Sequence, residues 1–539
     1  MSIERWNPST TTTQLEQRLL ARMGRHRKLF AFLRTHRREI LDDELLDKLA
    51  EMYRQTGAGK APVCPGLMAM AALLQGYDKV SDAEAVERTV VDLRWQMVLD
   101  VLRAEKPAFS QGAFQDFRHK MIAHDIDRLL LERTAKLAKE TGAFDSRKLP
   151  QSLRVAIDSM PLEGAGRVED TINLLAHAGR KVAACAARLL DCDIDQLCAQ
   201  AGAPLLTASS VKAALDLKWS DEDDKHDAVT QLSLQLVALE RWLNERLPAS
   251  VAEPPLKTHI ETIHQIIDQD LEPDPEGGGG AKIAHGVAPD RRVSVEDKEM
   301  RHGRKSKSKR FDGYKRHIAV DMDTALILAC ALAPANQPEG LAATDLAADL
   351  KHCGLSPDSL FIDRAYVNAP IVDAVVAKKK GPVVCRPWQA TNRGYFPKDL
   401  FQIDLRSRTI TCPEGHSEAF TLGATVEFDP DICEPCPSRS RCTPARTGHG
   451  RTISVASNEP LQKKLRKILD TRAGRAQLRE RVVVEHILAH AGYRQGRRAR
   501  YLGVRHNLWD WRRAATITNL QTIHRGVTMA DLTEQRMAA

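Results

Sequence analysis

Two short stretches constrain the fold of this chain more than any other, because each is a run of β-forming residues that leads to an aspartate. Residues 153–161 alternate in polarity and include the β-branched Val155 and Ile157, which predicts a buried strand ended by its final proline. Asp158 would then lie at the carboxyl end of that strand, where open α/β sheets bind ligands. Residues 360–363 repeat the pattern and end on a second aspartate. One aspartate after a strand is usually a turn residue, but two such strands predict a shared acid site.

A third acid, Glu485, lies in a predicted long C-terminal helix, within the stretch Arg481-Val-Val-Val-Glu485. Its apolar neighbours, residues 482–484 and Ile487, indicate that this helix packs on the sheet, although an ordinary surface acid is the alternative for Glu485 alone. We call Asp158, Asp363 and Glu485 the acid triad. Carboxylate oxygens suit Mg²⁺ or Mn²⁺ rather than zinc. Two such ions about 3.5–4 Å apart can activate a water or a 3′-hydroxyl and stabilise the leaving oxygen of a phosphodiester.

The region between the two aspartates predicts both strands and helices. Strand signals at 314–320 and 326–332 are separated by a turn, which predicts a hairpin. A helix over 339–351 follows, then the strand that leads to Asp363, a helix capped by Asn368 and a last strand over 382–386. These elements predict an α/β sheet with a hairpin at one side.

Two other regions read as helical. Residues 31–148 carry apolar side chains at helical spacing, with a helix end at Gly57–Gly59, and the polar residues before them are expected to form a flexible tail. A second helical region follows the Asp158 strand, and its clearest part has a seam typical of a coiled coil or helical hairpin. The seam residues are Val229, Leu232, Leu236, Leu239 and Leu243. A glycine-rich linker over 273–280 ends this region.

The positive charge of the chain is concentrated in two windows. The formal net charge is +8. Residues 301–316 hold eight Lys or Arg and one acid, and residues 481–513 hold eight Arg and two acids, so the rest of the chain is slightly acidic. Basic charge beside an acid site predicts a polyphosphate partner, and two solvated basic surfaces are the alternative.

The length of 539 residues predicts two to four domains. The first residues lack the apolar segment of a signal peptide, and the longest apolar run, residues 326–334, is far too short to span a membrane. We therefore expect an intracellular protein whose 11 cysteines are reduced or metal-bound.

Four of these cysteines have the spacing of a structural zinc site, and we call them the cysteine cluster: Cys412, Cys433, Cys436 and Cys442. His416 could replace one of the four ligands. The alternative is a set of reduced thiols in a loop-rich insert.

Several motifs together resemble those of the DDE transposases of bacterial insertion sequences. They are Ala156-Ile-Asp158-Ser, Gly303-Arg-Lys-Ser306 with Lys309-Arg-Phe-Asp-Gly-Tyr-Lys315, Asp363-Arg-Ala-Tyr366 and Arg481-Val-Val-Val-Glu485. The resemblance covers nearly the whole chain and implies a ribonuclease-H-like mixed sheet in which the acid triad binds metal. Arg481 matches the arginine of the family's tyrosine-arginine-glutamate-lysine signature. Leu478 and Gly492 stand where its tyrosine and lysine are expected, and Arg494 is the cation nearest to the second position.

The resemblance implies cleavage of DNA at the ends of the element and transfer of the freed 3′-hydroxyl into target DNA, with two Mg²⁺ or Mn²⁺ ions. The alternatives are a DNA-binding protein that no longer cleaves and a metal-dependent nuclease. The expected partners are double-stranded DNA, as terminal inverted repeats and target, and a second copy in a homodimer. The expected location is the cytoplasm, with the nucleoid when DNA is bound.

Eleven cations are predicted to contact DNA, mainly through phosphates. They are Arg304, Lys305, Lys307, Lys309, Arg310, Lys315, Arg481, Arg494, Arg497, Arg498 and Arg500. Four aromatic residues among the later arginines could stack on bases or pack in the core: Tyr493, Tyr501, Trp509 and Trp511.

The predicted domain division follows these patterns. It lists a flexible tail (1–30), an all-helical domain for DNA-end binding or dimerisation (31–148), the first parts of the catalytic core (149–166 and 296–387), a helical insert with its linker (167–295), a cysteine-rich insert (388–458) and the C-terminal helices of the core that carry Glu485 (459–539).

Overall fold

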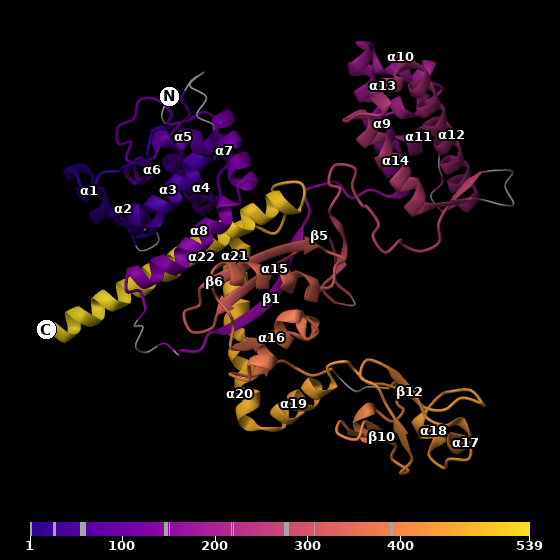
Figure 1. The fold of residues 1–539 in the computed structure, drawn as a ribbon. Coiled ribbons are helices and arrows are strands. Elements are labelled where there is room, and N and C mark those ends of the chain that lie inside the picture. The colour runs from indigo at the N-terminus through magenta and orange to yellow at the C-terminus, as the bar shows by residue number, and fades with distance from the viewer. Residues whose placement is uncertain are drawn as a thin grey trace.

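The computed structural model describes residues 3–24, 28–53, 61–144, 149, 151–216, 218, 220–273, 280–306, 308–388 and 392–538, with side chains up to residue 528. A mixed sheet lies at its centre, with helices on its faces and two inserts extending from it (Figure 1). The strand order is β4-β5-β1-β7-β8. β4 and β6 pair with different halves of the same edge of β5. The strands are β1 (Arg154–Glu163), β4 (Arg301–Arg304), β5 (Arg310–Asp321), β6 (Ile327–Pro334), β7 (Ser359–Phe361) and β8 (Val383–Val384).

The first strand is longer than the sequence indicates. We expected the proline at 161 to end it, but β1 continues to Glu163 because its whole length pairs antiparallel with β5. Its parallel pairing with β7 stops at Ala156 opposite Phe361. Asp158 therefore lies within β1 and not at its end. It belongs to the part of β1 that extends beyond the shorter β7.

The remaining elements of the sheet follow the prediction closely. β5 and β6 form the predicted hairpin, and the predicted helix after it is α15 (Glu339–His352). The next helix is α16 (Pro370–Lys378), but Asn368 does not cap it. The Asn368 side chain instead accepts a hydrogen bond from Asn458 at 2.7 Å, which explains why it is not available as a cap.

The N-terminal region is helical, as predicted. Its helices are α1 (Gln14–Arg22), α2 (Lys28–Ile40), α3 (Asp43–Glu51), α4 (Pro65–Asp78), α5 (Asp82–Val91), α6 (Leu93–Leu99), α7 (Gln111–Ala123) and α8 (Ile126–Glu140). The expectation of a flexible tail is wrong for the described residues before 25. Trp6 is buried, Thr13 and Glu16 form a capping box at α1, and Glu16 pairs with Arg34 in the core. The helix end predicted at Gly57–Gly59 lies outside the described residues.

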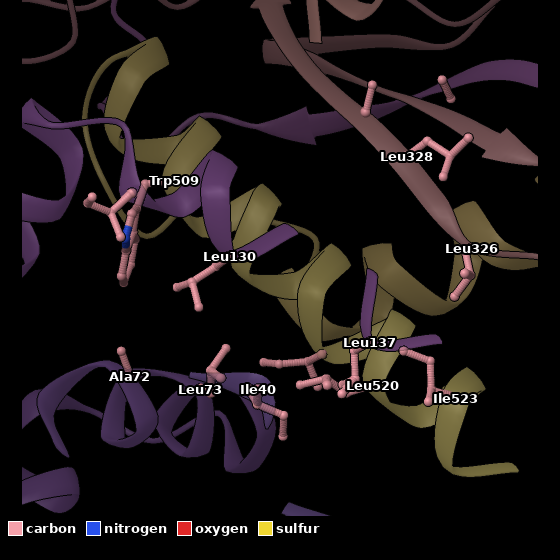
Figure 2. Packing of buried hydrophobic residues seen from close by; sticks show 14 of the residues in the cluster. Ile40, Ala72, Leu73, Leu130, Leu137, Leu326, Leu328, Trp509, Leu520 and Ile523 are labelled. Carbon is pink, nitrogen blue, oxygen red and sulfur yellow. The ribbon is translucent and has the colours of Figure 1, made fainter. Parts of the chain in front are cut away.

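Two C-terminal helices, α21 (Val482–Gln495) and α22 (Val504–Ala538), connect the N-terminal helices to the sheet. Figure 2 shows Leu520 and Ile523 of α22 close to Leu137 of α8. Leu328 of β6 and Leu326, just before that strand, belong to the same apolar cluster. Ala72 and Leu73 of α4 and Trp509 of α22 belong to it as well. The N-terminal helices and one face of the sheet therefore share a single hydrophobic core.

The helical insert has a core of its own. It contains α9 (Thr171–Leu190), α10 (Ile194–Gln200), η2 (Pro204–Thr207), α11 (Val211–Ala214), α12 (Glu222–Arg246), α13 (Pro248–Val251) and α14 (Leu256–Asp270). All five predicted seam residues of α12 are buried, and α12 packs on α9 and β3 within a small bundle. A short hairpin of β2 (Leu271–Pro273) and β3 (Ala281–Ile283) was not predicted. Most of the predicted linker, residues 274–279, lies outside the described residues.

The cysteine-rich insert contains two small sheets and short helical turns. Its elements are η4 (Lys398–Leu400), β9 (Gln402–Asp404), β10 (Thr409–Thr411), β11 (Ser417–Ala419), β12 (Thr425–Glu427), α17 (Pro430–Cys433), α18 (Arg439–Cys442) and β13 (Thr452–Ser454). The helices α19 (Glu459–Asp470) and α20 (Arg472–Glu480) lead back from it to α21 (Figure 1). Within the described part of the chain, no helix is both long and apolar enough to cross a membrane.

Candidate active site

The three acids of the triad line one cavity of about 390 Å³, which we call the acid cavity. Asp158 comes from β1, Asp363 from the turn after β7, and Glu485 from the first turn of α21. The convergence predicted from the sequence is therefore present, although the acids are far apart along the chain. Arg304, Lys305 and Lys315 line the same cavity.

Local structure holds each acid in a defined place. The backbone N–H of Ser159 donates to Asp158 Oδ1 at 2.9 Å. Asp363 caps the short helix η3 (Arg364–Tyr366) and accepts from the backbone N–H of Arg364 at 2.7 Å. On α21, Val484 and Leu488 are buried in the cluster that covers the sheet, so this packing fixes the position of Glu485 between them.

Arg481 ties two of the acids together. Its Nη2 lies 2.9 Å from Glu485 Oε1 and its Nη1 lies 3.4 Å from Asp158 Oδ2. Burial raises the pKa of Asp158, the Arg481 guanidinium opposes that rise, and the negative charges of Glu485 and Asp363 add to it. The other two acids are thus close enough to disfavour the ionised form of Asp158.

A fourth acid in the cavity, Glu339, was missed by the sequence analysis. It lies in the first turn of α15, where acids are common because they favour the helix N-terminus, so the sequence gives no reason to single it out. Only the path of the chain from β6 into α15 brings it to the acid cavity. Burial raises the pKa of Glu339, while Lys315, whose Nζ lies 3.9 Å from Glu339 Oε1, opposes the rise.

Buried groups also lie near the acids, since His317 pairs with Ser159 in the sheet. His317 Nδ1 and the Tyr366 hydroxyl are 2.7 Å apart, and both side chains are fully buried. Burial lowers the pKa of His317 to about 3, so its ring is neutral at physiological pH. Trp511 Nε1 donates to the His317 carbonyl at 3.0 Å. These contacts join β5, η3 and α22.

The predicted DNA-contacting cations fall into different environments. Lys309 and Arg310 are exposed at the start of β5, and Lys307 lies outside the described residues. Arg497 is 86% exposed and pairs with Glu163 at 2.7 Å. Arg498 donates to the carbonyls of Gly164 and Ala165, each at 3.1 Å. Arg500 is exposed on the same segment.

Arg494 does not line the acid cavity. Its guanidinium lies 5.3 Å from the ring centroid of Tyr77 on α4, and burial lowers its pKa. The structure thus brings it to the N-terminal helices rather than to the triad.

Part of the charge in the second basic window is balanced inside the protein. Arg512 pairs with Asp127 and Asp349, and Arg513 pairs with Asp510 at 2.5 Å. Arg512 thereby holds α22 against α8 and α15, and both arginines are buried. A run of charge in the sequence therefore overstates the basic surface.

The four aromatic residues also separate into two groups. Trp509 and Trp511 are 2% and 0% exposed, so they pack in the core and are not available to stack on bases. Tyr501 packs edge-on against Trp509. Tyr493 is 76% exposed, with Lys79 Nζ 3.2 Å from its ring centroid.

The cysteine cluster lines a second, small cavity of about 30 Å³, together with His416. Burial raises the pKa of Cys442, and the other three cysteines add to the rise. Each of the 11 cysteines is a free thiol. Across the residues that the structure describes, no three His, Cys, Asp or Glu side chains are arranged in the geometry of a metal site.

Comparison with known families agrees with this architecture. The family model described as "Transposase DDE domain" matches residues 286–520, which include Asp363 and Glu485. The model described as "Transposase domain (DUF772)" matches residues 24–120, which cover helices α2 to α6 and most of α7. No curated protein and no solved structure matched the chain.

The mixed sheet, the acid cavity and the DDE-domain match together define an enzyme of the DDE class. The second match extends the assignment to the N-terminal helices, and the chain belongs to the DDE-type transposases of insertion sequences. The family generally uses divalent metal ions, and transposases act on DNA.

Proposed function

We propose that the acid triad binds two Mg²⁺ or Mn²⁺ ions and that this site cleaves DNA at the ends of the element and joins the freed 3′-hydroxyl to target DNA. The observation that carries the proposal is the convergence of the three acids on one cavity lined by three cations. Asp158 lies outside the span matched by the DDE-domain model, so its role depends on this geometry alone.

The ligand types in the cavity suit divalent metal, although in this structure no three of the described side chains are arranged as a metal site. All ligands offered are carboxylate oxygens, which Mg²⁺ and Mn²⁺ prefer. Burial and the two neighbouring acids raise the pKa of Asp158, and a bound cation would favour its charged form. Two ions would activate the attacking oxygen and stabilise the leaving oxygen of the phosphodiester.

The side chains of the chain itself would bind and orient the DNA. Arg304, Lys305 and Lys315 line the cavity and would hold phosphates next to the acids. Arg497, Arg498 and Arg500 follow α21 and would extend that contact along the backbone of the duplex. Arg481, which the resemblance aligns with the arginine of the signature, contacts Asp158 and Glu485 and would lie beside a phosphate bound at these acids. The N-terminal helices would bind terminal repeats or form the homodimer that brings two ends together.

The reaction products test the proposal. The full chain is incubated with DNA that carries its element end, a target plasmid and Mg²⁺, Mn²⁺ or EDTA. We expect cut and joined products only with metal, and neither product from Asp363→Asn. Products that are cut but never joined would indicate a nuclease. Tight binding without cutting at any metal concentration would indicate a protein that only binds DNA.

We also propose that the cysteine cluster binds one structural zinc ion. The support is that four thiols from two chain segments line one small cavity, a donor set that zinc prefers. Zinc content per chain, measured on the purified protein and on Cys436→Ser, tests this directly. One equivalent that falls to nearly none is expected, and equal zinc in both proteins would contradict it.

A further inference from the structure

Glu339 enters the acid cavity from an element that carries none of the triad residues. It begins α15, which packs on β5, β6 and η3, and its side chain is 23% exposed. The residue before it, Pro338, provides no side-chain cap, so the first backbone N–H groups of α15 lack a partner of that kind. The positive end of the helix dipole therefore favours a charged carboxylate at this position.

The neighbours of Glu339 do not neutralise it fully. The nearest cation, Lys315, donates through Nζ to the Gln337 carbonyl at 3.0 Å and stays 3.9 Å from Glu339 Oε1. That distance is longer than a charge-assisted hydrogen bond. The charges of Asp363 and Asp158 act on Glu339 from within the same cavity. A mostly buried carboxylate beside two others, with its cation held at a distance, is costly unless a further cation enters.

Glu339 also shares a neighbour with the triad. Ser159 lines the same cavity, its hydroxyl opposes the rise in the pKa of Glu339, and its backbone N–H donates to Asp158 Oδ1. Glu339 and Asp158 therefore both lie next to this serine.

We propose that Glu339 is a fourth carboxylate of the acid cavity and that it holds divalent metal together with Asp158 and Asp363. This inference rests on the proposed metal site of the triad. It assigns α15 a direct part in the chemistry, and Lys315 becomes the group that balances Glu339 until metal binds.

Metal binding by the full chain tests the inference without reference to turnover. Mn²⁺ affinity and stoichiometry are measured by titration calorimetry, and Mn²⁺ coordination by electron paramagnetic resonance, for wild type, Glu339→Gln and Asp363→Asn. The matched control is Asp373→Asn, which removes an exposed acid from the first turn of α16, away from the cavity.

We expect Glu339→Gln to weaken Mn²⁺ binding at least about 10-fold or to lose one ion, with a changed resonance spectrum, while the control binds as wild type. Wild-type affinity and spectrum in Glu339→Gln, with binding lost in Asp363→Asn, would overturn the inference and leave the proposed function intact. Unchanged binding in both variants would overturn the triad site itself.

A second measurement remains informative even if Glu339→Gln lowers the stability of the protein. The rise in melting temperature that saturating Mn²⁺ produces is compared within each variant, so a lower starting value does not matter. A smaller rise in Glu339→Gln, restored in part by Glu339→Asp, supports a ligand role. An equal rise in wild type and Glu339→Gln contradicts it.

Discussion

The acid cavity and the cysteine cluster are both collections of metal-ligand side chains, but they are built in opposite ways. The acids come from three elements of one sheet-centred fold that share large hydrophobic cores. The cysteines lie on turns of one insert, whose own core has seven buried residues. A core that small rarely stabilises a fold without a disulfide or a bound metal ion. Metal is therefore expected to serve chemistry at the acid cavity and stability at the cysteine cluster.

The largest effect that would sharpen this contrast is expected from Asp158→Asn. Loss of a metal ligand removes several kcal/mol of transition-state stabilisation, so strand cleavage should fall roughly 10³-fold or more. Because burial raises the pKa of Asp158, the folded state disfavours its charge, and stability should be unchanged or slightly higher. Cleavage rates and urea denaturation on the same samples measure both. A large loss of stability would show that the acids hold the fold.

Cys433→Ser should give the reverse pattern. We expect the insert to become sensitive to proteases between residues 396 and 455, while the melting of the main core stays as in wild type and cleavage falls less than about 10-fold. Limited proteolysis with mass spectrometry locates the cuts. If Cys433→Ser abolished catalysis while the insert stayed resistant, the two metal sites would not differ in the way described.

Glu459 joins the cysteine-rich insert to α19 and should have a smaller, pH-dependent effect. It is buried at the start of α19 and pairs with Lys398 of the insert and with Arg466. Burial opposes its ionisation, but the hydrogen bond and charge of Lys398 outweigh it and lower the pKa of Glu459. Glu459→Gln should cost about 2 kcal/mol at pH 7, because it removes the charged acceptor of the half-buried Lys398.

The sign of that pH dependence follows from the lowered pKa. The stabilisation is present above the pKa of an unfolded glutamate and is lost as pH falls through the lower folded value. The difference in unfolding free energy between wild type and Glu459→Gln, measured by urea denaturation, should therefore decrease below about pH 4. A gap that is constant from pH 7 to pH 3 would exclude an ionised Glu459 as its source.

The smallest effect is expected from Arg497→Ala with Arg498→Ala, which tests whether DNA contact extends beyond the acid cavity. Each lost phosphate contact should reduce the slope of log K against log salt by about 0.9, so the pair should reduce it by at most about 2. Binding of element-end DNA at several salt concentrations measures the slope, and Lys257→Ala on the exposed side of α14 serves as control. An unchanged slope would remove this segment from the interface.

The sequence was most informative where a local pattern decides the outcome. Alternating strands led to Asp158 and Asp363, and cysteine spacing identified a group that does share one cavity. Prediction from the sequence failed where contacts with residues far along the chain determine the structure. β1 continues past its proline because β5 pairs along its whole length, and Glu339 reaches the acids only through the topology of α15. Arg512 looks like part of a basic surface until its partners on α8 and α15 are known.

The core that α22 shares with α4, α8 and β6 has a consequence for how the protein is made. The helices that leave the ribosome first cannot complete their packing until residues 509–523 have also been synthesised. A chain stopped early would expose apolar surface and be cleared by cellular proteases, so a truncated copy of the gene should yield little surviving product.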